Sequence, residues 1–259
     1  METKQNLKIS GSGSFGGGIY DEVKISGSGS INGDLECNTL KCSGSADIVG
    51  NVISKNMKFS GSASIKGNVK TEIIEVSGSV KVNGNVDSDE IKVSGGSQIS
   101  GDVRTRKIKI SGGSSIDGNL YGEEVDISGS INIKKDCESE SFKASGGMNI
   151  EGLLNAGEVN INLYGRCRAK EIGGENINVR LSAFDESIVA KFLKTMFSYR
   201  RELITEAIEG DNIYLEGTTA KIVRGNNVTI GRGCYIEKVE YSGEINIIDE
   251  GKVENQVRI

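Results

Sequence analysis

Residues 57–69 read MKFSGSASIKGNV, and this pattern recurs about every 17 residues from near the N-terminus to about residue 180. A Ser-Gly pair marks the period most clearly. It occurs at Ser26-Gly27, Ser43-Gly44, Ser60-Gly61, Ser77-Gly78, Ser94-Gly95, Ser111-Gly112, Ser128-Gly129 and Ser145-Gly146, after a first copy at Ser10-Gly11. A fixed period of this length is typical of a solenoid, in which each repeat forms one coil.

Four columns of apolar residues appear when the repeats are aligned. They begin at Val23, Ile25, Ile31 and Leu35. The columns share one parity and mostly polar residues lie between them, which predicts short strands with apolar side chains facing one interior. The fourth column fails at Glu171, where the repeat loosens. Two glycine columns, which start at Gly27 and Gly33, predict corners between the strands.

Composition supports this fold and limits the chemistry. Proline is absent, as suits a backbone whose N–H groups are paired almost throughout. Histidine is also absent, which removes the commonest general base and metal ligand. We therefore expect no catalytic residues, no cofactor, no metal and no enzymatic activity.

Charge and hydropathy restrict the partners and the location. The net charge of −5 argues against nucleic acid as a partner. No apolar run is long enough to span a membrane, and the first residues carry no signal-peptide core. We expect a cytoplasmic protein, with peripheral contact to the inner face of the membrane or to the cell wall left open. Five cysteines without paired spacing predict reduced thiols.

Residues 185–209 break the strand pattern and predict an amphipathic α-helix, with Asp185 as its N-cap and Gly210 just past its end. We expect three possible uses for it: packing on the solenoid, binding a protein partner or a second copy, and contacting a membrane surface. Its predicted contact face comprises Ile188, Phe192, Met196, Phe197, Leu203 and Ile204.

Strand-like alternation resumes after residue 210 and continues to the C-terminus. The predicted organisation is therefore a main β-solenoid over residues 1–184, the helix insertion over 185–210, and closing coils of the same solenoid over 211–259. The two end coils expose unpaired backbone, which favours end-to-end association. The predicted self-assembly interface comprises Leu7, Ile9, Phe15, Ile19, Ile245, Ile247, Val253, Val257 and Ile259.

The motifs INGDL at 31–35, IKGNV at 65–69 and VNGNV at 82–86 resemble those of the bactofilins, which are bacterial cytoskeletal proteins. The C-terminal runs 220–225, 230–234 and 239–242 are similar to those of the longer members found in Gram-positive bacteria. The resemblance implies a right-handed parallel β-helix, non-polar filaments joined end to end without nucleotide, and a scaffolding role. Many bactofilins also carry a membrane-binding N-terminal tail, which we do not find here.

Two columns of outward residues could bind a ligand or could be purely structural. The lysine column runs from Lys24 through Lys41 and Lys58 to Lys143, and could bind an anionic partner or form a solvated face. The Asp/Asn column that starts at Asp34 could suggest calcium. The nonapeptide of calcium-binding β-rolls is absent, which favours a ladder of turn residues.

Three functions compete on these observations. The first is a non-enzymatic, self-assembling scaffold. The second is an enzyme built on a β-solenoid, such as a polysaccharide lyase or an acyltransferase, for which the required residues are missing. The third is a monomeric binding module that uses the 185–209 helix to hold a protein partner.

Overall fold

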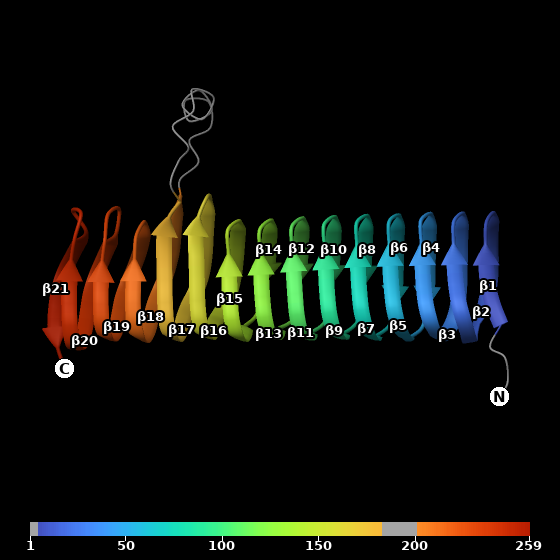
Figure 1. Cartoon of the computed structure of the whole chain (residues 1–259), viewed down its shortest axis with the longest axis horizontal. Helices are drawn as coiled ribbons and strands as arrows, with labels where there is room; N and C mark the ends of the chain where they lie inside the picture. The colour runs from blue at the N-terminus through green and yellow to red at the C-terminus, as the bar shows by residue number, and fades with distance from the viewer. Residues whose placement is uncertain (1–4, 183–200) are drawn as a thin grey trace, which may run out of the picture. The chain divides into compact units, whose positions relative to one another are not determined.

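Every secondary-structure element in the described part of the chain is a β-strand (Figure 1). The computed structural model describes residues 5–182 and 201–259. The described strands pair in parallel, each with strands about one repeat earlier or later in the chain. This pairing defines a parallel β-solenoid, so the predicted all-β solenoid is confirmed.

The chain divides into two compact units. Unit 1 comprises Met1–Val125 and Gly129–Lys134, and unit 2 comprises Asp126–Ser128 and Lys135–Ile259. The predicted boundaries at residues 184 and 210 stay predictions.

After residue 28 the strands of unit 1 alternate between longer and shorter ones. They are β1 (Gln5–Ile9), β2 (Ser12–Ile25), β3 (Ser28–Cys42), β4 (Ser45–Val49), β5 (Val52–Phe59), β6 (Ser62–Lys66), β7 (Val69–Val76), β8 (Ser79–Val82), β9 (Val86–Val93), β10 (Gly96–Ile99), β11 (Val103–Ile110), β12 (Gly113–Ile116), β13 (Leu120–Ile127) and β14 (Ser130–Ile133). The last two residues of β13 belong to unit 2.

The strands of unit 2 have 7 to 17 residues, and five of the seven have 13 or more. They are β15 (Cys137–Ala144), β16 (Gly147–Leu163), β17 (Arg166–Leu181), β18 (Glu202–Leu215), β19 (Thr218–Ile230), β20 (Tyr235–Ile247) and β21 (Lys252–Arg258).

One coil of unit 1 consists of an eight-residue strand and a strand of four or five residues. In β5, inward side chains are two residues apart except in the middle, where Ser54 and Met57 are three apart. This extra residue marks a bend within the strand. The inward side chains of the coil made by β5 and β6 are all buried: Val52, Ser54, Met57, Phe59, Ala63 and Ile65. The interior therefore has six columns, two more than the sequence predicts. The additional columns, those of Ser54 and Ala63, were not recognised because small and hydroxyl side chains do not stand out as apolar.

The Ser-Gly corner brings successive backbones into contact. A Cβ atom at Gly61 would lie 2.0 Å from the carbonyl oxygen of Gly44. The same corner pairs the coils, since the Ser60 N–H donates to the Cys42 carbonyl at 2.8 Å and the Ser62 N–H to the Gly44 carbonyl at 2.9 Å. Glycine is required here by the close approach of two backbones.

The predicted helix over 185–209 is wrong where the structure describes it. Residues 185–200 lie outside the described residues, but 202–209 form the first part of β18. Leu203, Thr205 and Ile208 point inward and are buried, and this step of two followed by three imitates a helical stripe. Gly210, predicted to follow the helix, lies within β18, where a Cβ atom would meet the Gly174 carbonyl oxygen at 2.3 Å.

The coils of unit 2 vary in length. Val159 pairs with Ile177, 18 residues later, whereas Leu203 pairs with Thr218, 15 residues later. The apolar column that fails at Glu171 continues one residue further on, at Ile172, after a register shift in β16. The loosened sequence repeat thus reflects changing coil length, while parallel stacking continues within the unit.

Candidate self-assembly surfaces

The N-terminal end of unit 1 is closed by the coil that contains β1. Within residues 5–182 and 201–259, β1 pairs only with β2, so its outer edge carries no strand partner. Ile9 is buried and Leu7 is half-buried, whereas the Phe15 side chain is 38% exposed. An unpaired strand edge beside apolar side chains is a template for adding another strand.

Phe15 covers the interior of this end coil. A Cβ atom at Gly13 would lie 2.9 Å from the Phe15 ring, so the ring lies over the glycine. Ile9 likewise approaches Gly29, where a Cβ atom would lie 2.9 Å from its Cδ1. Ile19 differs from its predicted neighbours, because it pairs with Glu36 at an outward position on the side of the coil.

The C-terminal end of unit 2 is closed by β21, which pairs only with β20 among the described strands. Ile245, Val253 and Val257 are half-buried, and Ile247 and Ile259 are exposed. Gln256 pairs with buried Val239 and places an exposed polar side chain at the end of an inward column. The nine predicted interface residues therefore lie in the first and last described coils; whether they join copies stays a prediction.

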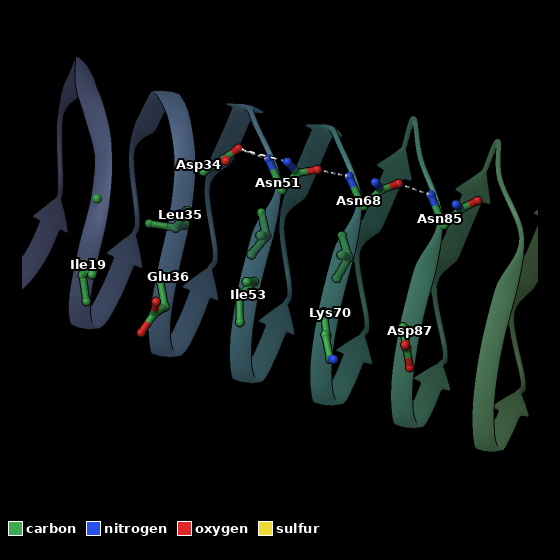
Figure 2. Close-up of a pocket in the computed structure, with 13 residues that line it drawn as sticks. Ile19, Asp34, Leu35, Glu36, Asn51, Ile53, Asn68, Lys70, Asn85 and Asp87 are labelled. Carbon is green, nitrogen blue, oxygen red and sulfur yellow. Dashed lines mark hydrogen bonds between the residues drawn. The ribbon is translucent and has the colours of Figure 1, made fainter.

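A ladder of Asp and Asn side chains runs along one corner of unit 1 (Figure 2). The Asn51 N–H donates to Asp34 Oδ1 at 2.7 Å, the Asn68 N–H to Asn51 Oδ1 at 2.9 Å, and the Asn85 N–H to Asn68 Oδ1 at 2.9 Å. The backbone carbonyl oxygens of the column accept in turn from the coil before: the Asn68 carbonyl accepts from the Val52 N–H at 2.8 Å, and the Asn85 carbonyl accepts from the Val69 N–H at 2.9 Å. The predicted ladder of turn residues is confirmed.

A second ladder of hydroxyl groups lies inside the bend of the longer strands. The Thr71 hydroxyl donates to the Lys55 or Ile73 carbonyl, at 3.0 and 3.4 Å. The Ser88 hydroxyl has the equivalent partners, at 3.2 Å to Glu72 and 3.0 Å to Glu90. These buried hydroxyls satisfy carbonyl groups at the bend, which explains why the column tolerates polar side chains.

The lysine column forms a solvated, ion-paired face. Lys41 contacts Glu22 at 2.9 Å and Lys58 contacts Glu75 at 2.9 Å. The hydrogen bond from Lys58 lowers the pKa of the Glu75 carboxyl. These ion pairs neutralise much of the positive charge of the lysine column, which an anionic partner would require.

A row of outward side chains lies beside the Asp/Asn ladder, one on each successive coil, and we call it the flank row. Its members are Ile19, Glu36, Ile53, Lys70 and Asp87, which Figure 2 shows side by side. A groove of about 520 Å³ runs between the flank row and the ladder. No sequence motif marks this row, because its residues share only their position in the repeat.

The predicted helix contact face is only partly described. Ile188, Phe192, Met196 and Phe197 lie outside the described residues. Leu203 is buried in the core of unit 2, and Ile204 is half-buried on the outward side of β18. These two residues serve the solenoid, so they form no helical surface.

Glu216 is a buried carboxylate in unit 2 that the sequence did not single out. Its Oε2 accepts from the Leu181 backbone N–H at 2.8 Å, and its Oε1 accepts from the Tyr214 hydroxyl at 3.1 Å. Burial and Glu216 itself raise the pKa of the Tyr214 hydroxyl. Glu216 therefore fixes the end of β17, immediately before residues 183–200.

The described residues offer little for catalysis or metal binding. No group of three or more Cys, Asp or Glu side chains among them could hold a metal ion. All five cysteines are buried and none forms a disulfide, and burial raises the pKa of the Cys137 thiol to about 12. Within the same residues, no helix is long and apolar enough to span a membrane.

Parallel coils with an inter-coil Asp/Asn ladder define a structural class, the parallel β-solenoid. Residues 1–87 and 45–121 match the family model of the bactofilins, described as polymer-forming and cytoskeletal. This match covers the repeats that carry the resemblance, and residues 1–121 are therefore similar to the bactofilins.

Two Bacillus subtilis (strain 168) proteins are similar to part of the chain. YhbF is 34% identical over 110 residues, which cover 42% of this chain and 42% of YhbF. YhbE is 40% identical over 111 residues, which cover 42% of this chain and 44% of YhbE. The alignments thus span less than half the length of either relative. The chain matches no solved structure.

Proposed function

We propose that this protein is a non-enzymatic cytoskeletal scaffold of the cytoplasm that forms filaments without nucleotide. Copies stack end to end. Each end coil has one strand edge without a partner, and an end coil of the next copy provides that partner. The family match supports polymer formation as the general function. The observation that carries the mechanism is that both described end coils combine an unpaired strand edge with exposed apolar side chains.

The end coils suit this role because stacking supplies what each coil lacks. A single coil of a solenoid cannot bury enough surface to order itself, so its stability depends on its neighbours. A second copy placed on the Leu7 and Phe15 side would pair the edge of β1 and cover the Phe15 ring. A copy placed on Ile247 and Val253 would do the same for β21.

The test uses purified full-length protein without nucleotide, examined by negative-stain electron microscopy and high-speed pelleting. We expect filaments from the wild type, and their loss in Leu7→Asp and Ile247→Asp with β-rich circular dichroism retained. Val49→Asp is the matched control, because it puts the same charge at an exposed apolar position on the side of a coil. A monodisperse wild-type monomer at micromolar concentration would contradict the proposal, as would filaments from both end variants.

A further inference from the structure

The flank row of unit 1 contains two exposed isoleucines, Ile19 and Ile53, and Ile53 lies at its centre. Ile53 is 53% exposed and lies between Glu36 and Lys70, its partners on the adjacent coils. It also lines both grooves that flank the row. A single exposed isoleucine is ordinary on a protein surface. The charges on either side of it are what make this position informative.

We propose that Glu36, Ile53 and Lys70, the centre of the flank row, form a lateral contact between two copies of this chain, arranged antiparallel about a twofold axis at Ile53. Ile53 packs against Ile53 of the second copy. Glu36 faces Lys70 of the second copy, and Lys70 faces Glu36 of the second copy. The contact is isologous, because the same patch serves both copies. It goes beyond end-to-end stacking, since it uses the side of the coils.

The order of charges selects the antiparallel arrangement. Successive coils are about 4.8 Å apart, so the residue one coil before Ile53 and the residue one coil after it lie at equal distances from the axis. In a parallel arrangement each side chain would face its own copy, placing Glu36 on Glu36 and Lys70 on Lys70. Only the antiparallel arrangement brings unlike charges together on both sides of the isoleucine pair.

The surroundings of the row allow a second copy to approach. Figure 2 shows Glu36, Ile53 and Lys70 projecting on the same side of three successive coils. The neighbouring Val52 and Val69 are buried and point the other way. Lys55 follows at the bend of the strand, at the rim of the contact, where water screens its charge.

One such contact is small, and copies in solution would bind through it weakly. Copies joined in a filament present the row repeatedly, and each contact after the first forms at a high effective concentration. The lateral contact therefore predicts that filaments bundle. Two copies outside a filament would bind weakly through the same residues.

Charge exchange tests the geometry. Low-speed pelleting collects bundles and high-speed pelleting collects all filaments, so the two measurements separate lateral from end-to-end contacts. We expect Ile53→Asp, Glu36→Lys and Lys70→Glu each to lower the low-speed pellet about tenfold and to leave the high-speed pellet unchanged. The double variant Glu36→Lys/Lys70→Glu should restore bundling, because unlike charges face each other again. Val49→Asp, on the preceding strand, should behave as the wild type.

A cross-linking experiment tests the same contact without filaments. Ile53→Cys places one reactive thiol on the axis, whereas the five native cysteines are buried. Mild oxidation should link Ile53→Cys into dimers and leave Val49→Cys unlinked. Equal cross-linking at both positions, or a double charge exchange that fails to restore bundling, would overturn the proposal. Absence of a high-speed pellet in the wild type would instead count against end-to-end stacking. The cross-linking of Ile53→Cys would then decide alone whether the lateral contact exists.

Discussion

The backbone N–H of Asn85 donates to the side-chain Oδ1 of Asn68, one coil earlier, at 2.9 Å. At this corner the chain leaves strand geometry, and a side chain supplies the acceptor that a neighbouring strand would otherwise offer. The acceptor always belongs to the earlier coil, as in the contact of the Asn119 N–H with Asp102 Oδ1. The ladder therefore joins neighbouring coils in one direction along unit 1.

Removing one acceptor should weaken the stack locally. We expect Asn68→Ala to lower the free energy of unfolding by about 0.5–1.5 kcal/mol, because the exposed Asn85 N–H exchanges its side-chain acceptor for water. Asn68→Asp should cost much less, since Asp34 and Asp102 are native acceptors in the same column. Urea unfolding followed by circular dichroism measures both. Equal destabilisation by the two variants would show that the side-chain oxygen is not the important group.

Two adjacent glycines provide a strict test of the Ser-Gly corner. A Cβ atom at Gly112 would lie 2.0 Å from the Gly95 carbonyl oxygen, whereas a Cβ atom at Gly113 would have no atom within 4 Å. We expect Gly112→Ala to destabilise the protein by about 3 kcal/mol or more and Gly113→Ala to change it by less than about 0.5 kcal/mol. The melting temperatures of the two variants should therefore differ clearly. Similar melting temperatures would mean that the corner relaxes to admit a methyl group.

The buried thiols predict a loss of stability at high pH. Burial raises the pKa of Cys137 to about 12 and that of Cys167 to about 11, from 9.0. Above pH 9 the unfolded chain releases these protons while the folded chain retains them, so stability falls as pH rises towards the folded pKa values. Each thiol contributes a slope of roughly 1 kcal/mol per pH unit in that window.

Cys137→Val should make this pH dependence shallower, because valine occupies the same column elsewhere and does not titrate. The comparison with wild type between pH 8 and 11 isolates the thiol, since tyrosines and lysines titrate in both proteins. Identical slopes would show that Cys137 is ionised or accessible in the folded state.

Glu216 should stabilise the fold through the hydrogen bonds that its carboxylate accepts. We expect Glu216→Ala to destabilise the protein by about 2 kcal/mol, because it leaves the Leu181 N–H and the Tyr214 hydroxyl without their acceptor. Glu216→Gln retains an acceptor oxygen and should recover much of this loss. Protease sensitivity near Leu181 offers a second measurement and should rise in the alanine variant only.

The regular repeats made unit 1 predictable. The members of an apolar column, such as Leu35 and Val52, fall at a constant spacing, and the pairs in the structure follow that spacing residue by residue. The Asp/Asn ladder followed from the same logic, because identical turn residues stack when identical coils stack. The inward hydroxyl column was missed, since Ser54 and Thr71 are polar by type and buried only through contacts with carbonyl groups.

Unit 2 was harder to predict, because its coil length changes. The predicted helix drew on Leu203, Ile204 and Ile208, whose spacing fits both a helix and a bent strand. Long-range pairing decides between them: Leu203 pairs with Cys167 on one side and Thr218 on the other. Glu216 and the flank row carry no local signal, as each depends on which residues the coils bring together.

The pairing of β17 with β18 has a practical consequence. Arg166 pairs with Glu202 and Val179 with Leu215, although residues 183–200 lie between the two strands in the chain. Closing a loop costs only slightly more as the loop lengthens, so a longer connection between two paired strands adds little to the free-energy cost of folding. A fluorescent reporter or an affinity tag placed between Ser182 and Arg201 should therefore be carried without altering the coils. The position offers a permissive site from which assembly could be followed in living cells.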